Sequence, residues 1–594
     1  MKQFLKYVLA TVVGIFIFGV LAALLSVMTL VGMINMQSTS SSVTDGSVLV
    51  IQLQGIIQER NTDNPFGLLL GNSATEQQGL DDILAAIRHA KNDDKVKGIY
   101  LEAGTLVGAM PATLQAVRRA LVDFKQSGKF IVSYGDFYTQ GAYYVCSVAD
   151  SLVVNPQGIV DWSGLSSKVT YYKDLLEKVG VEMQVVKVGT YKSAVEPFML
   201  SEMSEANREQ IETYDGEIWG EMTKAVSKSR GINEAKLNEL ADSLIVLQDP
   251  TVFKKEKLVD KLAYSDAVPG IIANTMKVDS PDDYHTVTVA DLVSLTENEP
   301  KGTSGDVVAV YYAVGDILQE PSVSFVQSPE IVAKKVIRDL EKLADDDEVK
   351  AVVLRVNSGG GSAYASEQIW HQVMSIKAKK PVVVSMGDMA ASGGYYISCA
   401  ADYIYAEPTT VTGSIGIFGI FPNAGELLND KLGVHFSTVK TNQFSDFGDA
   451  SRPFTEQERT KAQAYVNRGY ELFTKRCADG RKMKQDAIKK IGEGRVWTGL
   501  HAKQIGLVDE LGGLDKAIEK AKKLAKLEEA SIMTYPSKGS LLNSLWDTMK
   551  NDSYADKKMK QLMGDYYTFF ADMKRLHQHT GIQASMPYRL MFNL

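Results

Sequence analysis

The second half of the sequence holds a serine in a setting suited to nucleophilic chemistry. In the run MAASGGYY, Ser392 follows the apolar run PVVVSM, which predicts a strand, and precedes an apolar run that predicts a helix. A hydroxyl at such a junction lies beside backbone N–H groups that have no partner inside the helix, and these groups suit a developing oxyanion. Gly393 would let a substrate approach closely. The simpler interpretation is that Ser392 only caps the helix, as serine often does.

A glycine-rich turn could supply further donors to the same oxyanion. The run VNSGGGSAYASE begins at Val356, directly after the strand-like run AVVLRV. Its three consecutive glycines permit a positive φ and leave N–H groups open to an approaching carbonyl oxygen. A flexible turn is the simpler interpretation. A phosphate-binding loop is disfavoured because no GKS or GKT follows.

A nucleophilic serine needs a base, and Lys192 is the candidate. No histidine stands in a motif near either block, whereas the run QVVKVGTYKSAVEPF places Lys192 after a predicted strand, in a segment with few charges. A free lysine, with a pKa of ~10.4, is protonated at neutral pH, so this one must be buried. Lowering its pKa by roughly three units costs about 4 kcal/mol. For a lysine taken alone, a solvated surface charge is the simpler interpretation.

An internal repeat explains both residues together. The run GDFYTQGAYYVCSVADSLVVNP, residues 135–156, matches GDMAASGGYYISCAADYIYAEP, residues 387–408, at a constant offset of 387 − 135 = 252. In this alignment Ser392 has Gln140 as its counterpart, and Lys192 aligns with Ser445 in the second half. The serine therefore occurs only in the second half and the lysine only in the first. We predict one composite site assembled from two degenerate halves.

The elements that must position these residues follow from the same repeat. Each half alternates short β-branched runs, such as VLVIQL and VVAVYY, with helical stretches, which predicts an α/β fold with a largely parallel sheet. The polar run TENEPKGTSG predicts a linker between the halves. We expect the first repeat at residues 44–299, the second at 304–540, and a helical C-terminal tail at 541–594.

The N-terminus predicts a membrane anchor within residues 1–36. Residues 7–34 are uncharged and mostly apolar, which exceeds the ~20 residues that a spanning helix needs. Lys2 and Lys6 precede this run, so the positive-inside rule keeps the N-terminus cytoplasmic and places the body on the other side. A cleaved signal peptide is the alternative, but the run GMINMQS lacks its small-residue exit.

Composition excludes several classes of function. The net charge of −8 shows no basic excess, so we expect no nucleic-acid partner. The three cysteines, Cys146, Cys399 and Cys477, have no metal-ligand spacing and are expected to be buried. Only His577 and His579 lie close together among the histidines. We predict neither a metal nor a cofactor.

The motifs together resemble the signal peptide peptidase A (protease IV) family in its long, duplicated form. The resemblance rests on the anchor, VGTYKSAVEPF around Lys192, VNSGGGSAYASE, MAASGGYY around Ser392, and TGSIGIFG, residues 412–419. It implies two tandem Clp-protease/crotonase-like repeats, with Ser392 as the nucleophile and Lys192 as the base. It also implies that Ser414 of TGSIGIFG holds the lysine amine.

The same resemblance extends to the oxyanion site, the assembly and the substrate. It implies backbone N–H donors at Gly360, Gly361 and Gly393. It further implies a homotetramer on the extracytoplasmic, periplasmic side of the bacterial inner membrane, anchored in lipid by the N-terminal helix. The substrates would be signal peptides and other apolar peptides, left after signal peptidase has acted.

Three alternatives stay open from the sequence. A crotonase-type acyl-CoA enzyme would use the same oxyanion donors without a serine and lysine pair. A non-catalytic membrane scaffold would keep both halves for assembly only. A Ser–His–Asp protease would show a plateau of activity near neutral pH, whereas a lysine base predicts activity that rises towards alkaline pH.

Overall fold

The computed structural model describes residue 14 and residues 43–61, 77–297, 305–322, 329–537 and 581–585. Apart from residue 14, the predicted anchor therefore lies outside the described residues, as do most of the predicted linker and most of the predicted tail. Among the residues that are described, no helix is both long enough and apolar enough to cross a membrane.

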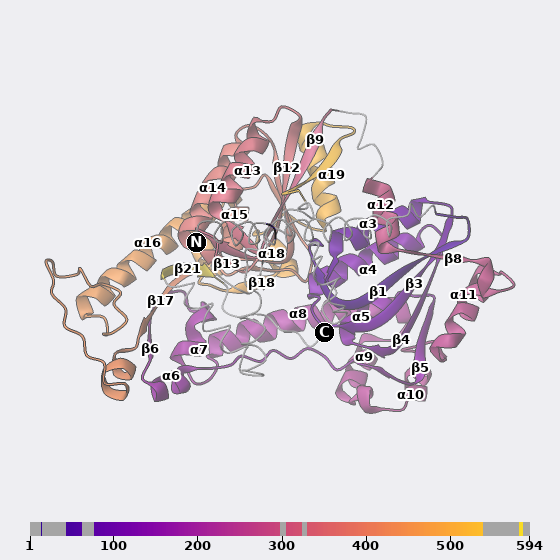
Figure 1. The fold of residues 1–594 in the computed structure, drawn as a ribbon, viewed down its shortest axis with the longest axis horizontal. Coiled ribbons are helices and arrows are strands. Elements are labelled where there is room, and N and C mark those ends of the chain that lie inside the picture. The colour runs from indigo at the N-terminus through magenta and orange to yellow at the C-terminus, as the bar shows by residue number, and fades with distance from the viewer. Residues whose placement is uncertain are drawn as a thin grey trace, which may run out of the picture.

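The first half builds a parallel sheet with helices on its two faces (Figure 1). Its strands lie in the order β2 (Gln77–Gly79), β1 (Ser47–Gln58), β3 (Val96–Leu106), β4 (Phe130–Tyr138), β5 (Ser151–Val160) and β7 (Lys261–Leu262), with β8 (His285–Thr288) also paired to β1. Its helices are α3 (Leu80–Asn92), α4 (Pro111–Lys125), α5 (Gln140–Cys146), α9 (Glu234–Asp242), α10 (Pro250–Lys255), α11 (Val268–Met276) and α12 (Val289–Glu297).

The second half repeats this order, which confirms the predicted α/β class. The neighbours β20 (Ser531–Tyr535), β9 (Val307–Val314), β12 (Val349–Ser358), β14 (Val382–Ala391), β15 (Tyr403–Ala406) and β19 (Glu510–Leu511) correspond to β8, β1, β3, β4, β5 and β7. Strands β16 (Val411–Gly413) and β18 (Val496–Thr498) extend this sheet beyond the end of β14. The helices are α13 (Ala333–Asp345), α14 (Ala363–Lys377), α15 (Gly393–Ser398), α17 (Gln485–Ile491), α18 (Gly499–Gln504) and α19 (Leu514–Ala525).

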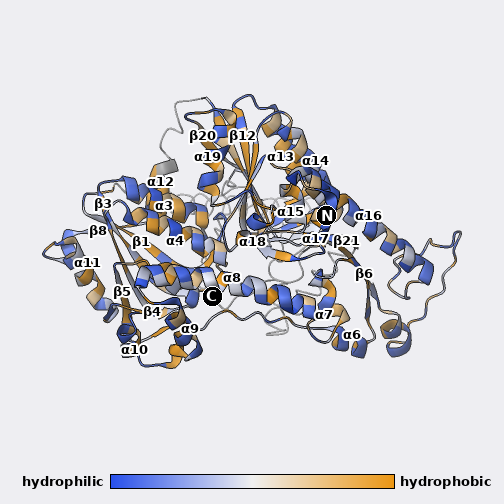
Figure 2. Ribbon diagram, turned by 180° about the vertical axis from the view of Figure 1, so that it is seen from behind, coloured by the Kyte–Doolittle hydropathy of each residue, from blue (hydrophilic) through white to orange (hydrophobic). Residues whose placement is uncertain are grey.

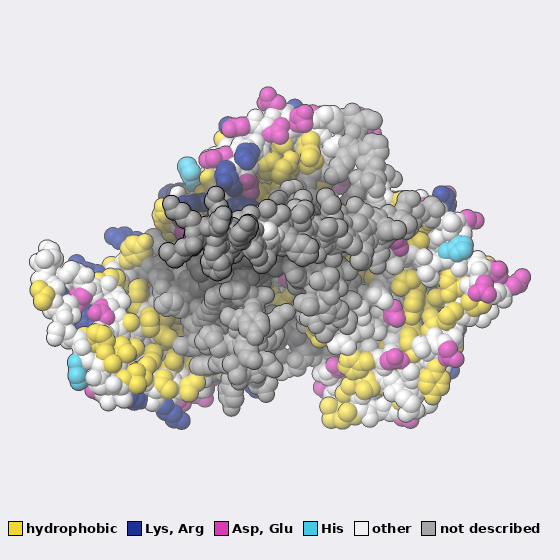
Figure 3. All heavy atoms as spheres, in the orientation of Figure 1, with side chains coloured by type: hydrophobic (Ala, Val, Ile, Leu, Met, Phe, Trp, Pro, Cys, Tyr) yellow, Lys and Arg dark blue, Asp and Glu magenta, His cyan; other side chains and the backbone are white. Residues whose placement is uncertain are grey.

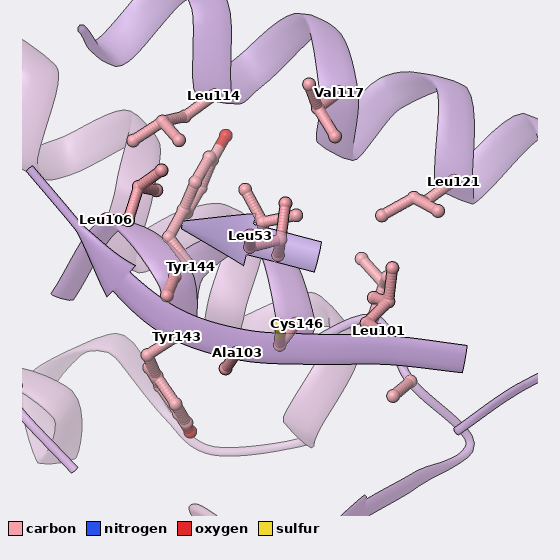
Figure 4. Packing of buried hydrophobic residues seen from close by; sticks show 14 of the residues in the cluster. Leu53, Leu101, Ala103, Leu106, Leu114, Val117, Leu121, Tyr143, Tyr144 and Cys146 are labelled. Carbon is pink, nitrogen blue, oxygen red and sulfur yellow. The ribbon is translucent and has the colours of Figure 1, made fainter. Parts of the chain in front are cut away.

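Alternation along the strands divides each half into two cores. On β9, Ala309 and Tyr311 pack with α13 and α14, whereas Val308 and Val310 pack towards α19. In the first half, Leu53 and Leu101 of the sheet meet Leu114 and other apolar side chains of α4 (Figure 4). Hydrophobic residues lie mainly on the strands, and hydrophilic residues lie mainly on the long outer helices (Figure 2).

A third sheet joins the two halves. Its order is β11 (Glu330–Val332), β10 (Asp316–Leu318), β13 (Gly360–Ser362), β21 (Gly581–Ser585), β17 (Ile417–Asn423) and β6 (Glu182–Val188). Strand β6 belongs to the first half by sequence, yet it pairs antiparallel with β17 over seven residues, from Ile417↔Val188 to Asn423↔Glu182. Residues 581–585 form a strand, which corrects the predicted helical tail at these positions.

Each repeat also carries one long helix. Helices α8 (Glu205–Arg230) and α16 (Glu456–Arg481) have 26 residues each and occupy the charged stretches that follow the core of each repeat. The Ser204 hydroxyl accepts from the Asn207 N–H, and Thr455 forms a capping box with Glu458, so each helix begins at a defined residue. Helices α6 (Lys173–Val179) and α7 (Glu196–Met199) lie on either side of β6 in sequence.

The three cysteines are free and buried, as predicted. Cys146 lies in α5 against the first core, and Cys399 and Cys477 lie in the second. Each therefore acts as a small apolar side chain in the packing.

Candidate active site

Ser392 occupies the single residue between strand β14 and helix α15. Its φ of 54° and ψ of −113° place a non-glycine residue in a strained region of backbone space. The backbone N–H of Ser392 donates to the carbonyl oxygen of Gly413 at 2.8 Å, which fixes this turn. The side chain makes no capping hydrogen bond to α15, so the simpler interpretation of Ser392 as a helix cap is wrong.

Lys192 reaches Ser392 from the other half of the chain. It follows β6, and its Nζ lies 2.8 Å from Ser392 Oγ, although the two residues are 200 positions apart. Lys192 and Ser392 are both fully buried. Burial lowers the pKa of Lys192 well below its usual range, because desolvation penalises the ammonium form. The structure thus brings together the two residues that the sequence singled out.

Ser414 supplies the other partners of the amine. Nζ of Lys192 lies 3.0 Å from Ser414 Oγ and 3.1 Å from the Ser414 carbonyl oxygen. A neutral amine has two N–H donors and one lone pair, and the carbonyl oxygen can only accept. When both N–H groups are donated to Ser414, the lone pair remains for the hydroxyl proton of Ser392. An ammonium group would instead donate to all three oxygens.

A tight loop of the second half closes over Lys192. Gly494 has a φ of 79°, and a Cβ added there would lie 2.6 Å from Lys192 Cβ. A Cβ on Gly416 would lie 3.2 Å from Lys192 Cδ. The Tyr191 N–H donates to the Glu493 carbonyl oxygen at 2.9 Å, which ties the loop to the chain just before the lysine. Sequence reasoning missed Gly416 and Gly494, although Gly416 stands in the run TGSIGIFG, residues 412–419.

The predicted oxyanion glycines surround the turn at Ser392. Gly393 is the first residue of α15, where a helix leaves its N–H groups without internal partners. A Cβ on Gly360, whose φ is 101°, would lie 2.7 Å from the Gly393 nitrogen, so these two glycines are neighbours. The Gly360 N–H already donates to Ser358 Oγ at 3.1 Å. Gly361 follows in β13, paired with Ile317 on one side and Ala584 on the other.

The corresponding position of the first half is filled by a carboxamide. Gln140 begins α5, and its Oε1 accepts from the N–H groups of Ser163 and Gly164 at 3.0 and 2.8 Å. A side chain that holds a loop in this way leaves no hydroxyl nucleophile at the turn. Of the two residues of the reacting pair, the first half therefore contributes only Lys192.

A buried polar network fastens the two halves together beneath the site. Arg355 of β12 makes a bidentate pair with Glu59 of the first half, both bonds being 2.9 Å. Asp388 of β14 accepts from the Thr113 N–H at 2.7 Å and from its hydroxyl at 2.6 Å. Burial, and then the nearby Glu59 carboxylate, raise the pKa of Asp388. Asn357 bonds to both Glu59 and Asp388, so the four polar residues and Thr113 form one cluster.

An apolar cavity of about 930 Å³ opens beside β17 and α15. Its walls include Tyr396 of α15, Ile417 and Phe421 of β17, and Tyr364 of α14. Such a cavity is of the size and character that binds apolar ligand groups. Within the part of the chain that the structure describes, no cluster of three or more His, Cys, Asp or Glu residues could hold a metal ion.

Comparison with known proteins agrees with this duplicated architecture. The family model of peptidase family S49 matches residues 123–279 and again residues 375–528. The model of Clp protease matches residues 307–411. Both S49 matches fall on corresponding parts of the two halves, so the structure has Clp-like S49 units in tandem.

Several curated proteins are similar over most of their length. The protein named Protease 4 of Salmonella typhi is 37% identical over 526 residues, covering 86% of this chain and 84% of that protein. Protease 4 of Haemophilus influenzae is 33% identical over 524 residues, covering 84% and 83%. The chloroplastic serine protease SPPA of Arabidopsis thaliana is 28% identical over 487 residues, covering 82% and 70%.

Proposed function

Because the chain belongs to peptidase family S49 and is thus a serine peptidase, we propose that it degrades signal peptides and other apolar peptides, with Ser392 as nucleophile and Lys192 as general base. The observation that carries this proposal is the 2.8 Å contact between Lys192 Nζ and Ser392 Oγ in a fully buried site. Family membership assigns hydrolysis, so neither the scaffold nor the acyl-CoA alternative is retained.

The contacts of the amine define the proposed first step. Neutral Lys192 accepts the Ser392 proton while Ser392 Oγ attacks a peptide carbonyl carbon. The resulting ammonium has three donors, and the two oxygens of Ser414 accept two of them. The third donor stays directed at the reaction centre, where it protonates the leaving amine. Water then hydrolyses the acyl-enzyme, with Lys192 again taking the proton.

Backbone donors would stabilise the tetrahedral intermediate. Gly393 presents its N–H at the start of α15, directly after the nucleophile. Gly360 and Gly361 approach from β13, and their lack of side chains lets a substrate carbonyl come close. Donors of this kind act strongly because the site is dry and they need no reorganisation.

The cavity supports a preference for apolar peptides. Strand β17 contributes Ile417 and Phe421 to its wall, so an extended peptide bound at the site would place apolar side chains in the cavity. Aromatic walls at Tyr396 and Phe421 favour apolar side chains there.

We further propose that the protein is a homotetramer, anchored in the bacterial inner membrane by residues 7–34 with its body on the periplasmic side. Support for assembly comes from an apolar surface on the lobe formed by α6, β6, β17 and the chain that follows (Figure 3). Exposed side chains in this lobe include Leu175, Val179, Leu432 and Phe436. Large exposed apolar patches of this kind are typical of interaction surfaces.

Hydrolysis of an apolar fluorogenic peptide tests the proposed pair. Ser392→Ala and Lys192→Met should each lower kcat/KM by about 1,000-fold or more, because each removes a reacting group. Wild-type kcat/KM should rise with pH until Lys192 is neutral and then level off. Lys192→Arg is the matched control, since arginine keeps a positive charge but does not release its proton. Retained hydrolysis in Ser392→Ala would refute the proposed nucleophile.

A further inference from the structure

A fully buried glutamine of helix α8 holds the chain on both sides of Lys192. Nε2 of Gln210 lies 3.2 Å from the carbonyl oxygen of Tyr191 and 3.1 Å from Oγ of Ser193. These two residues are the neighbours of the base in sequence. The amide group of one side chain therefore fixes the short segment from which the Lys192 side chain extends.

The oxygen of the same carboxamide binds the second half of the chain. Oε1 of Gln210 accepts from the backbone N–H of Val496 at 3.2 Å, although the two residues are 286 positions apart. Val496 begins β18 and pairs with Gly413 of β16. The carbonyl oxygen of Gly413 is the one that accepts from the Ser392 N–H. Gln210 thus connects the segment of the base to the strand pair that fixes the turn at the nucleophile.

The partners of Gln210 define the orientation of its side chain. A backbone carbonyl can only accept and a backbone N–H can only donate, so Nε2 faces Tyr191 and Oε1 faces Val496. Nε2 also lies 2.9 Å from Oδ1 of Asn207, three residues earlier on α8, which further restricts the side chain to this conformation. The side chain at this position must therefore both donate and accept a hydrogen bond.

The preceding residue of α8 strengthens the same junction from the outside. Glu209 accepts from the Tyr191 hydroxyl at 2.8 Å and forms a 2.8 Å ion pair with Arg495. The Arg495 guanidinium lies over the rings of Tyr191 and Trp497, 4.6 and 4.5 Å from their centroids. The Arg495 carbonyl oxygen accepts from the Ser414 N–H at 2.7 Å. Two adjacent residues of α8 therefore hold the segment of the base against the second half.

We propose that Gln210 is a positioning residue, which keeps the Lys192 amine within reach of the Ser392 hydroxyl. This inference rests on the proposed function. Proton transfer requires the 2.8 Å contact between Lys192 Nζ and Ser392 Oγ, and a displacement of about 1 Å in such a contact lowers rates by about 100-fold. Gln210 bonds to the residues on either side of Lys192 rather than to the amine, so it acts through the position of residues 191–193.

Replacement by methionine removes these hydrogen bonds and keeps the length of the side chain. Gln210→Met in the full-length protein should lower kcat on the fluorogenic peptide by about 10- to 100-fold, because the amine loses its fixed position. KM should stay within about twofold of the wild-type value, since the contacts with substrate are unchanged. Steady-state kinetics measure both constants. A raised KM with an unchanged kcat would contradict a positioning role.

Gln140→Met is the matched control. Gln140 is also fully buried and accepts from two backbone N–H groups, but it lies at the turn of the first half that has no nucleophile. Both variants should unfold at lower denaturant concentration than the wild type, since each leaves buried backbone groups unpaired. Gln140→Met should nevertheless keep kcat within about twofold of the wild type. Equal losses of kcat in the two variants would mean that Gln210 serves folding alone.

Gln210→Glu gives a second readout that retains a polar side chain. A protonated carboxyl group can donate to Tyr191 and accept from Val496 as the carboxamide does, whereas a carboxylate can only accept. Burial raises the pKa of a carboxyl group above its usual value of ~4.3, and a carboxylate would also favour the ammonium form of Lys192. The ratio of wild-type to variant kcat should therefore increase about tenfold between about pH 5.5 and about pH 8.5. A ratio that stays constant over this range would overturn the inference.

The Ser392→Ala variant separates this inference from the proposed function. An inactive Ser392→Ala variant together with a Gln210→Met variant that is as active as the wild type would overturn the positioning role and leave the proposed function standing. Retained hydrolysis in Ser392→Ala would overturn both.

Discussion

Burial of the Lys192 amine makes it available as a base but lowers the stability of the folded protein. Desolvation lowers the pKa of Lys192 in the folded protein, so the unfolded chain binds its proton more tightly. Between the folded pKa and about 10.5, the wild type therefore gains stability as pH rises. Below that window the folded protein must hold a buried ammonium group. The residue that serves as base is one that the fold would be more stable without.

Replacing Lys192 with methionine should therefore stabilise the protein at neutral pH while it abolishes activity. We expect a gain of about 2 kcal/mol in the free energy of unfolding at pH 7, in the range found when buried charged groups are replaced by apolar ones. The gain should shrink as pH rises towards 10.5, because the unfolded lysine then also becomes neutral. Denaturant titrations at pH 7 and pH 9.5 measure this. A pH-independent difference would contradict the buried neutral amine.

Ser414 should act as a positioning residue for the same amine. Its hydroxyl accepts from Lys192 Nζ, and such a bond favours the ammonium form more than the neutral one. Ser414→Ala should therefore lower the pKa of Lys192 further, so that the acidic limb of the pH–rate profile moves to lower pH. We also expect kcat to fall by about 10- to 100-fold, because the amine loses its orientation. A purely structural role would reduce kcat without moving the limb.

Comparing the sequences of the two halves could identify Ser392 and Lys192, because each aligns with a residue of another type in the other half, Gln140 and Ser445. Ser414 became a candidate only through the family resemblance. Gly494 gave no such signal, because its role depends on a contact with Lys192 that is distant in sequence. Residue types and spacing thus predicted the reacting groups better than the loop that holds one of them.

At the scale of elements, the loop that carries Gly494 sets the position of the base. Gly494→Ala would force a Cβ to within 2.6 Å of Lys192 Cβ, and the backbone φ of 79° disfavours alanine as well. We expect kcat to fall by about 100-fold, since displacements of about 1 Å have effects of that size. Steady-state kinetics on the fluorogenic peptide measure this.

Gly231→Ala is the matched control for that substitution. Gly231 has a similar φ of 63°, but a Cβ there meets nothing within 4 Å. Backbone strain should cost each variant about 1–2 kcal/mol of stability, to which the clash with Lys192 adds in Gly494→Ala, and only Gly494→Ala should lose activity. Equal activities in the two variants would show that the loop does not position Lys192.

The central parallel strands β9, β12 and β14 were predictable because each contains a short, apolar, β-branched run that is buried on both faces. The third sheet was not predictable in the same way. Its pairs, such as Ile417↔Val188, join residues that are far apart in sequence, and no local pattern specifies a partner. Strand β21 lies within the predicted helical tail, and its pairs with β13 and β17 join it to segments that are far away in sequence.

At the scale of the whole molecule, the composite site requires the two halves to keep a fixed position relative to each other. The Arg355 and Glu59 side chains are 5% and 4% exposed, and their pair crosses the boundary between the halves. Arg355 also donates to Ser385 and Met386 on β14, the strand that leads to Ser392. This network connects the interface to the nucleophile, and only the folded structure reveals it.

Removing one residue of the Arg355–Glu59 pair should lower the free energy of unfolding far more than removing one residue of an exposed ion pair. Glu59→Ala leaves a buried guanidinium without its carboxylate, so we expect a loss of about 3–5 kcal/mol in the free energy of unfolding. Asp123→Ala is the control, because its pair with Lys91 is 2.7 Å long but well exposed, and should lose at most about 1 kcal/mol. The double variant Glu59→Leu with Arg355→Met should lose less than Glu59→Ala, since no unpaired charge remains. Chemical denaturation of all three measures this. A Glu59→Ala loss no larger than that of Asp123→Ala would show that the two halves are held together by other contacts.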